Sequence, residues 1–151
     1  MRINVSNPII CSKELTNLKR CIKTNWLSSN GEFNKKFERK FSKIVNRKFC
    51  STVTNGTIAL EIAVRALNLK KGSEVIVPTF TIISPIIAIL NNGLVPVFVD
   101  SNKQWAMDTN QIENKITKKT SAILVVHTYS FPADMNKILK IKKKYKLKLI
   151  E

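Results

Sequence analysis

Three short runs of the chain are apolar without interruption, and stretches with a helical pattern separate them. These runs are residues 75–77, 95–99 and 123–126. A strand that is apolar at every position is typically buried on both faces, as in parallel sheets that helices cover. The pattern therefore predicts an α/β fold in which a mostly parallel sheet has flanking helices.

The boundaries of the expected elements follow from apolar spacing and from turn residues. In residues 33–45, apolar side chains recur every three or four positions, which predicts an amphipathic helix. Pro85 fits the first turn of a later helix, and Gly93 fits its end. Helices are expected at residues 15–23, 33–45, 58–67, from 85 to the turn at 91–93, 111–116 and 133–145, and strands at 49–53, 74–77, 95–99, 122–127 and 147–150.

Loops at the carboxyl ends of parallel strands are where ligands bind in folds of this type. We expect three such loops, at residues 54–57, 78–84 and 128–132. In the first loop, Gly56 lets the backbone approach a ligand, and the free amides of the following helix favour an anion such as phosphate. The same turn also fits an ordinary helix cap, in which one of its polar side chains satisfies the first amides.

Other residues near these loops have both a structural and a functional interpretation. Phe80 fits either stacking on a flat cofactor ring or filling of the core. His127, the only histidine, ends an apolar strand, where it fits either a ligand contact or a satisfied structural position. Residues 26–31 form a small polar turn after an aromatic residue, and they either close over a ligand or connect two helices.

Basic residues outnumber acidic ones by 26 to 10, which gives a net charge of +16. A basic α/β module that binds nucleic acid is one interpretation of this excess. However, only five of the basic residues are Arg, and a dedicated nucleic-acid binder more often concentrates Arg with aromatic residues. We therefore expect no nucleic-acid partner, and we expect the lysines of residues 137–148 to form a solvated helix face.

Cysteine usage and apolar stretches bear on the location of the protein. Cys11, Cys21 and Cys50 are odd in number and form no CxxC pair, so neither disulfides nor a metal site is expected. Residues 1–10 lack the apolar run of a secretory signal. The longest apolar stretch, residues 82–90, is too short to span a membrane. We therefore expect a cytoplasmic protein without a membrane partner.

In order and spacing, these motifs resemble the DegT/StrS family of pyridoxal-phosphate (PLP) sugar aminotransferases, which have PLP fold type I. The resemblance runs from about Trp26 to Glu151. The matching residues are Trp26, Leu27, Ser28, Ser29, Gly31, Phe37, Glu38, residues 54–57, Ala59, Leu60, residues 74–78, Phe80, Thr81, Gly93, residues 96–100, Thr120, His127, residues 132–135 and residues 150–151.

The resemblance implies a set of binding residues. Gly56 and Thr57 match positions that hold the phosphate of pyridoxal 5'-phosphate, which agrees with the argument from the helix terminus. Ile82 matches the position that stacks on the pyridine ring, where relatives often carry an aromatic residue. Ser130 stands where relatives usually carry Gly, which predicts a distorted turn. The substrate-binding residues implied by the resemblance are Trp26, Ser28, Ser29 and Gly31.

The resemblance also implies what the chain lacks. In the family, an Asp that pairs with the ring nitrogen follows the motif that ends here at Glu151, and the Schiff-base Lys lies further on. We therefore expect residues 1–151 to be an incomplete PLP-binding large domain, without the small C-terminal domain and without catalytic residues of its own. The last strand is expected to leave an unpaired sheet edge.

The implied activity is transfer of an amino group, with glutamate as donor, to a nucleotide-linked keto sugar in amino-sugar and polysaccharide biosynthesis. Residues 132–135 also resemble perosamine-type synthases, but this resemblance is too short to identify the sugar. Active sites of the family lie at a dimer interface, so the full-length protein is expected to be a homodimer. A non-catalytic remnant or a partial gene product remains the alternative interpretation.

Overall fold

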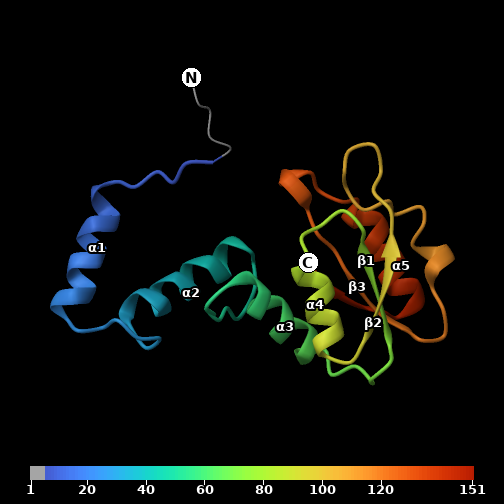
Figure 1. Cartoon of the computed structure of the whole chain (residues 1–151), viewed down its shortest axis with the longest axis horizontal. Helices are drawn as coiled ribbons and strands as arrows, with labels where there is room; N and C mark the ends of the chain where they lie inside the picture. Colours follow the sequence, from blue (N-terminus) through green and yellow to red (C-terminus); the bar gives the residue numbers. More distant parts are fainter. Residues whose placement is uncertain (1–5) are drawn as a thin grey trace. The chain divides into compact units, whose positions relative to one another are not determined.

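The computed structural model describes residues 6–151 and contains two compact units, Met1–Thr52 and Val53–Glu151, each described by itself. Residues 1–5, which form part of the segment expected to lack a secretory signal, lie outside the described residues. The first unit holds the helices α1 and α2, and the second holds the sheet and the other helices (Figure 1).

Helix α1 (Ser12–Lys23) begins before residue 15, where the sequence predicted its start. The cause is a cap at Cys11, whose backbone N–H donates to Oε2 of Glu14 at 2.9 Å. The helix ends in a Schellman motif, with Asn25 in the left-handed region at φ +58°. The backbone N–H of Trp26 closes this motif by donating to the carbonyl of Cys21 at 3.1 Å.

Helix α2 (Glu32–Ile44) confirms the amphipathic helix predicted at residues 33–45. Phe37 and Phe41, one turn apart, stack with their ring centroids 5.4 Å apart. Neither α1 nor α2 has a buried residue, so the apolar faces of both helices are exposed within the described structure.

The strand predicted at residues 49–53 is wrong, since this run has no regular secondary structure and joins no sheet among the described residues. Its polar groups bond to a helix instead: the backbone N–H and the hydroxyl of Thr52 both donate to Oε1 of Glu38, at 2.8 and 2.9 Å. These two hydrogen bonds hold the pKa of Glu38 below its usual range, and the one from the backbone of Thr52 has the larger effect. The β-favouring composition of the run is thus overridden by a contact with a side chain 14 positions away in the sequence.

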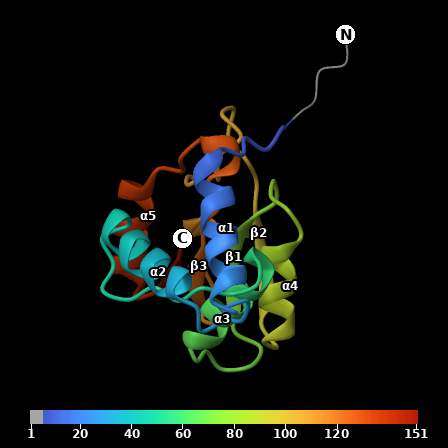
Figure 2. The ribbon, with the colours of Figure 1, turned by 90° about the vertical axis from the view of Figure 1, so that its left-hand side faces the viewer.

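The second unit is built on a four-stranded parallel sheet, which confirms the predicted fold class. Its strands lie in the order β2-β1-β3-β4, and neighbouring strands are parallel. Figure 2 shows α4 and α5 on opposite sides of the strands. The elements are α3 (Gly56–Ala66), β1 (Glu74–Pro78), α4 (Ser84–Asn91), β2 (Val95–Val99), β3 (Thr120–Leu124), α5 (Met135–Tyr145) and β4 (Lys148–Ile150).

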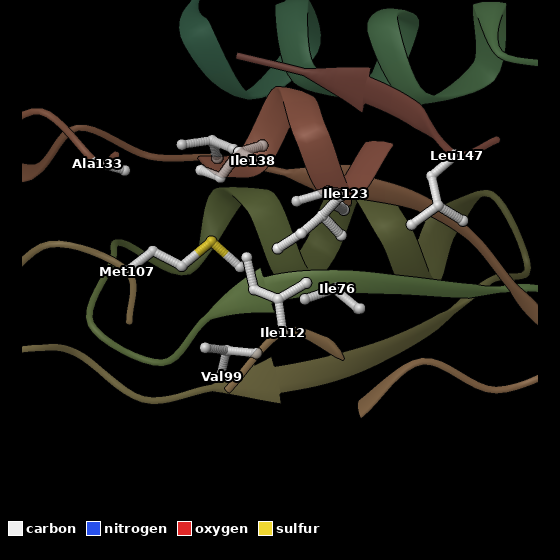
Figure 3. Packing of buried hydrophobic residues seen from close by; sticks show 10 residues of the cluster. Ile76, Val99, Met107, Ile112, Ile123, Ala133, Ile138 and Leu147 are labelled. Atoms are coloured by element: carbon white, nitrogen blue, oxygen red, sulfur yellow. The ribbon is translucent and has the colours of Figure 1, made fainter. Parts of the chain in front are cut away.

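Alternate residues of the central strands enter two separate cores. Ile76 and Ile123 pack on the face that α5 covers, with Ile138 of that helix (Figure 3). Val77 and Leu124 pack on the other face, in the cluster that includes residues of α3 and α4. Burial on both faces explains why residues 75–77 and 122–124 of these strands carry no polar side chain.

Strand β2 departs from this pattern because it lies at the edge of the sheet. Val95 and Phe98 are 46% and 44% exposed, so the prediction of burial on both faces is wrong for this strand. Most other boundaries differ from the prediction by one to three residues, and the helix predicted at residues 111–116 is only a 3₁₀ turn at Glu113–Lys115. At the opposite edge, β4 pairs with β3 alone among the described residues.

Candidate functional site

The loops at the carboxyl end of the sheet are bonded to one another. After β1, the backbone N–H of Thr79 donates to the carbonyl of Val99 at 2.9 Å, and its hydroxyl donates to Oδ1 of Asp100 at 3.0 Å. After β3, the hydroxyl of Thr128 donates to the carbonyl of Phe80 at 3.2 Å. These bonds fix the loop of residues 79–83 from both sides, so the residues that follow β1 have a rigid support.

The N-terminus of α3 carries two free amides. Its cap, Asn55, accepts a hydrogen bond from the amide of Ile58 at 2.9 Å through its side chain, and from Ala59 at 3.1 Å through its carbonyl. Within residues 6–151 the amides of Gly56 and Thr57 have no hydrogen-bond partner. The cap interpretation is therefore confirmed, and it is compatible with the anion interpretation, because the cap satisfies the third amide and leaves the first two without a partner.

Open space lies beside these two amides. A Cβ atom built on Gly56 would meet no atom within 4 Å, and the backbone there is not in the left-handed region. Gly56 is therefore not required by its own backbone conformation. The space that a side chain would fill is large enough for a phosphate oxygen to reach the backbone.

Thr57 links the N-terminus of α3 to that of α4. Its hydroxyl lies 2.8 Å from the hydroxyl of Ser84, the first residue of α4, and α3 packs along α4. The two helix N-termini thus meet at one point, where their dipoles both favour negative charge. Ser84 is not among the residues predicted for the site, although its position directly before Pro85 in a first helical turn is a usable signal.

Ile82 lies two residues before Ser84 and is 70% exposed. It lines a cavity of about 350 Å³ at the carboxyl ends of β1 and β3, together with Phe80 and Tyr129. The other lining residues are Thr81, Val126 and Thr128. The cavity is connected to the Thr57–Ser84 pair through the chain, since Ile82 precedes Ser84 by two residues, but neither Thr57 nor Ser84 lines it. Phe80 is half-buried, and its ring contacts the rings of Trp105 and Tyr129 in the wall of this cavity. It is therefore not part of the fully buried core.

His127 ties the end of β3 to Glu151 after β4. Its Nδ1 accepts a hydrogen bond from the amide of Ala133 at 3.1 Å, and its Nε2 lies 3.1 Å from Oε1 of Glu151. Because Nδ1 is an acceptor, the ring proton is on Nε2 and is donated to the carboxylate. His127 is thus a satisfied residue with both nitrogens occupied, which favours its structural interpretation.

The turn after His127 is strained, as the departure from Gly at Ser130 predicted. Tyr129 and Ser130 have φ values of +50° and +65°, although neither is glycine. A left-handed conformation costs a non-glycine residue about 1–2 kcal/mol. Both residues are exposed, so little packing offsets this cost.

Ser130→Gly is expected to raise the free energy of unfolding by about 0.5–1 kcal/mol, because Gly adopts this φ without the steric cost but loses more chain entropy. Urea denaturation of the variant would measure the change. Ser130→Ala is the matched control: it keeps the Cβ and is expected to bring no gain. An equal gain from both variants would contradict the proposed strain.

Trp26, Ser28, Ser29 and Gly31 lie in the other unit, in the connection between α1 and α2. Three of these residues are exposed, and Gly31 is buried as the cap residue of α2. The side-chain Nδ2 of Asn34 donates to the carbonyl of Ser29 at 2.6 Å and shapes this connection. The structure therefore brings together Thr57, Ser84 and the loop of Ile82, and it describes the Trp26–Gly31 residues separately.

Two negative findings apply to residues 6–151. None of the helices there has the length and hydropathy to cross a bilayer. No group of three or more His, Cys, Asp or Glu side chains in that range could hold a metal ion. Cys11, Cys21 and Cys50 are free thiols.

Comparison with known proteins assigns this arrangement to a family. A family model described as the DegT/DnrJ/EryC1/StrS aminotransferase family matches residues 8–151. GDP-perosamine synthase from Escherichia coli O157:H7 is 43% identical over 150 residues, which are 99% of this chain and 41% of that protein. The chain therefore spans about two fifths of the length of this curated relative.

Solved structures agree with that match. The aminotransferase from Psychrobacter cryohalolentis has a TM-score of 0.89 at 30% identity and covers 94% of this chain and 36% of its own. NtdA from Bacillus subtilis with bound cofactor PMP has a TM-score of 0.86 at 34% identity, over 93% of this chain and 33% of its own. The chain thus belongs to the DegT/DnrJ/EryC1/StrS aminotransferase family.

Proposed function

We propose that this chain is part of a PLP-dependent aminotransferase that moves an amino group, with glutamate as donor, to a keto sugar carried by a nucleotide. The observation that carries the proposal is the N-terminus of α3, where the amides of Gly56 and Thr57 have no partner among the described residues and the Cα of Gly56 borders open space. The bound cofactor found in the NtdA structure and the name of the perosamine synthase support the same class of reaction. The proposed location is the cytoplasm.

The residues of the second unit fit pyridoxal phosphate in two parts. Gly56 and Thr57 would hold the phosphate through their amides and the Thr57 hydroxyl, which are donors at a positive helix terminus. Ile82 would contact one face of the pyridine ring through its exposed side chain, in the cavity that it lines. When bound, the cofactor supplies the electron sink and the carrier for the amino group.

Trp26, Ser28, Ser29 and Gly31 are the proposed substrate residues. Trp26 is 50% exposed and offers a large apolar surface, while the hydroxyls of Ser28 and Ser29 offer donors and acceptors for a sugar. These properties support contact with a nucleotide-linked sugar but do not distinguish among such sugars.

Binding of pyridoxamine phosphate (PMP) tests the proposal. PMP is preferable to PLP because it has no aldehyde and cannot form imines with the many surface lysines. Titration calorimetry should show that PMP binds and that pyridoxamine, which lacks the phosphate, binds far more weakly. Inorganic phosphate should compete with PMP. Equal binding of PMP and pyridoxamine would show that no phosphate site exists and would defeat the proposal.

The contact with the ring can be tested at Ile82. Ile82→Phe should strengthen PMP binding, because stacking of two aromatic rings contributes about 0.5–1.5 kcal/mol beyond burial of area. Ile83→Phe is the matched control, since Ile83 is similarly exposed but does not line the cavity. The same gain from both variants would mean that Ile82 has no special place beside the ring.

The full-length protein is expected to be a homodimer. Apolar side chains are exposed along the first unit, including Leu18, Ile22 and Phe37, and patches of this kind are typical of interfaces. Sedimentation equilibrium of the full-length protein should give twice the mass of one chain. A single monomeric species at all concentrations would contradict this expectation.

A further inference from the structure

The hydroxyls of Thr57 and Ser84 form an isolated pair. They lie 2.8 Å apart, although the two residues are separated by 27 positions in the sequence. Within the described residues, neither hydroxyl has any other hydrogen-bond partner. Either hydroxyl can therefore be the donor of this hydrogen bond, and a ligand that accepts a proton from one of them decides which.

Counting protons shows what this pair does when an anion is present. A hydroxyl has one proton to donate and an oxygen that accepts. If Thr57 donates its proton to a phosphate oxygen, it cannot also donate to Ser84. The contact at 2.8 Å then survives only if Ser84 donates to Oγ1 of Thr57. The proton of Ser84 thus fixes the direction in which the proton of Thr57 points.

We propose that Ser84 is a positioning residue for the cofactor phosphate: its hydroxyl donates to Thr57 and so directs the Thr57 hydroxyl toward the phosphate. The inference rests on the proposed function. Ser84 is the first residue of α4, so the positive end of that helix favours the same orientation of the hydroxyl chain. A chain of two hydroxyls also polarises the outer one, which makes it a stronger donor to the anion.

Thr57, rather than Ser84, is the residue that faces the phosphate, because it shares the helix turn that carries the two free amides. Ser84 is followed by Pro85, which has no backbone N–H to donate. The N-terminus of α4 therefore presents fewer backbone donors than that of α3. Ser84 acts through Thr57 and makes no contact with the phosphate itself.

A double-mutant cycle tests this role. PMP and pyridoxamine are titrated into the unsubstituted chain and into Ser84→Ala, Thr57→Val and the double variant. Thr57→Val keeps the shape of the side chain and removes the hydroxyl. We expect Ser84→Ala to weaken PMP binding about 2- to 10-fold and Thr57→Val to weaken it about 10-fold or more. In the Thr57→Val background, Ser84→Ala should have no further effect.

Controls separate positioning from general structure. Ser84→Thr keeps a hydroxyl and should restore PMP binding, and urea denaturation should show that every variant is folded. Pyridoxamine binding should be the same in all variants, because it lacks the phosphate. A loss of pyridoxamine binding that equals the loss of PMP binding would overturn the inference, since the substitution would then act on the whole site.

Two other results would also overturn it: unchanged PMP binding in Ser84→Ala, or a loss that persists in the Thr57→Val background, which would mean that Ser84 contacts the phosphate directly. If instead the unsubstituted chain binds PMP no better than pyridoxamine, the proposed function fails and the inference fails with it. The first two results leave the phosphate site at Gly56 and Thr57 intact, so the two kinds of failure are distinguishable.

Discussion

Gly56→Val is expected to abolish specific PMP binding while the helix that follows stays folded. The substitution fits the backbone, because the φ of Gly56 is not left-handed and a Cβ there meets no atom within 4 Å. The new side chain occupies the space through which a phosphate must approach. Each lost charge-assisted hydrogen bond costs about 1.5–3 kcal/mol, so the loss of two corresponds to at least about a hundredfold weaker binding.

Ala66→Val is the matched control for this variant. It adds a β-branched side chain to the exposed far end of the same helix, about 15 Å from Gly56 at the usual rise per residue. It should leave PMP binding unchanged, although replacement of Ala by Val lowers the intrinsic helix propensity at that position. Calorimetric titration with PMP measures the affinity of both variants. If Gly56→Val binds PMP as well as the unsubstituted chain does, the phosphate is held elsewhere.

The 151-residue chain is expected to show no transaminase turnover by itself. The family resemblance places both the partner of the ring nitrogen and the Schiff-base Lys after Glu151. Without the first, no side chain would keep the pyridine ring protonated, and without the second, no side chain would carry the proton. The assay is consumption of glutamate in the presence of PLP and a nucleotide-linked keto sugar, with a full-length protein as the positive control.

Contaminating host aminotransferases would mimic activity in that assay, and Gly56→Val separates the two sources. Turnover by the purified chain that Gly56→Val abolishes would be genuine and would contradict the expectation. Turnover that persists in Gly56→Val comes from a contaminant. The full-length protein should lose its activity on the same substitution.

The sheet and its covering helices were predictable because their signals are strong and local. Residues 75–77 and 123–126 are apolar at each position, which is typical of strands buried on both faces. Edge position is not encoded in the same way: residues 95–99 have the same composition, yet among the described residues β2 pairs on one side only, and Phe98 is half-exposed. The position of a strand in the sheet depends on contacts distant in sequence, which hydrophobic patterning does not contain.

The site was predictable in part for similar reasons. The turn at residues 54–57 signals a helix start by itself, so Gly56 and Thr57 could be singled out. The contact of Thr57 with Ser84 depends on α3 packing against α4, and no spacing rule links positions 57 and 84. The strand prediction for residues 49–53 was wrong for the same reason. The N–H and hydroxyl of Thr52 donate to Glu38, which is 14 positions away in the sequence.

The position of the phosphate in a crystal structure of the chain with bound PMP tests the proposed cofactor site most directly. We expect its oxygens within about 3 Å of the amides of Gly56 and Thr57 and of the Thr57 hydroxyl. The pyridine ring should lie against Ile82. A phosphate bound instead in the basic cavity at the other end of the sheet, which Lys70, Lys71, Lys118 and Lys119 line, would contradict the assignment.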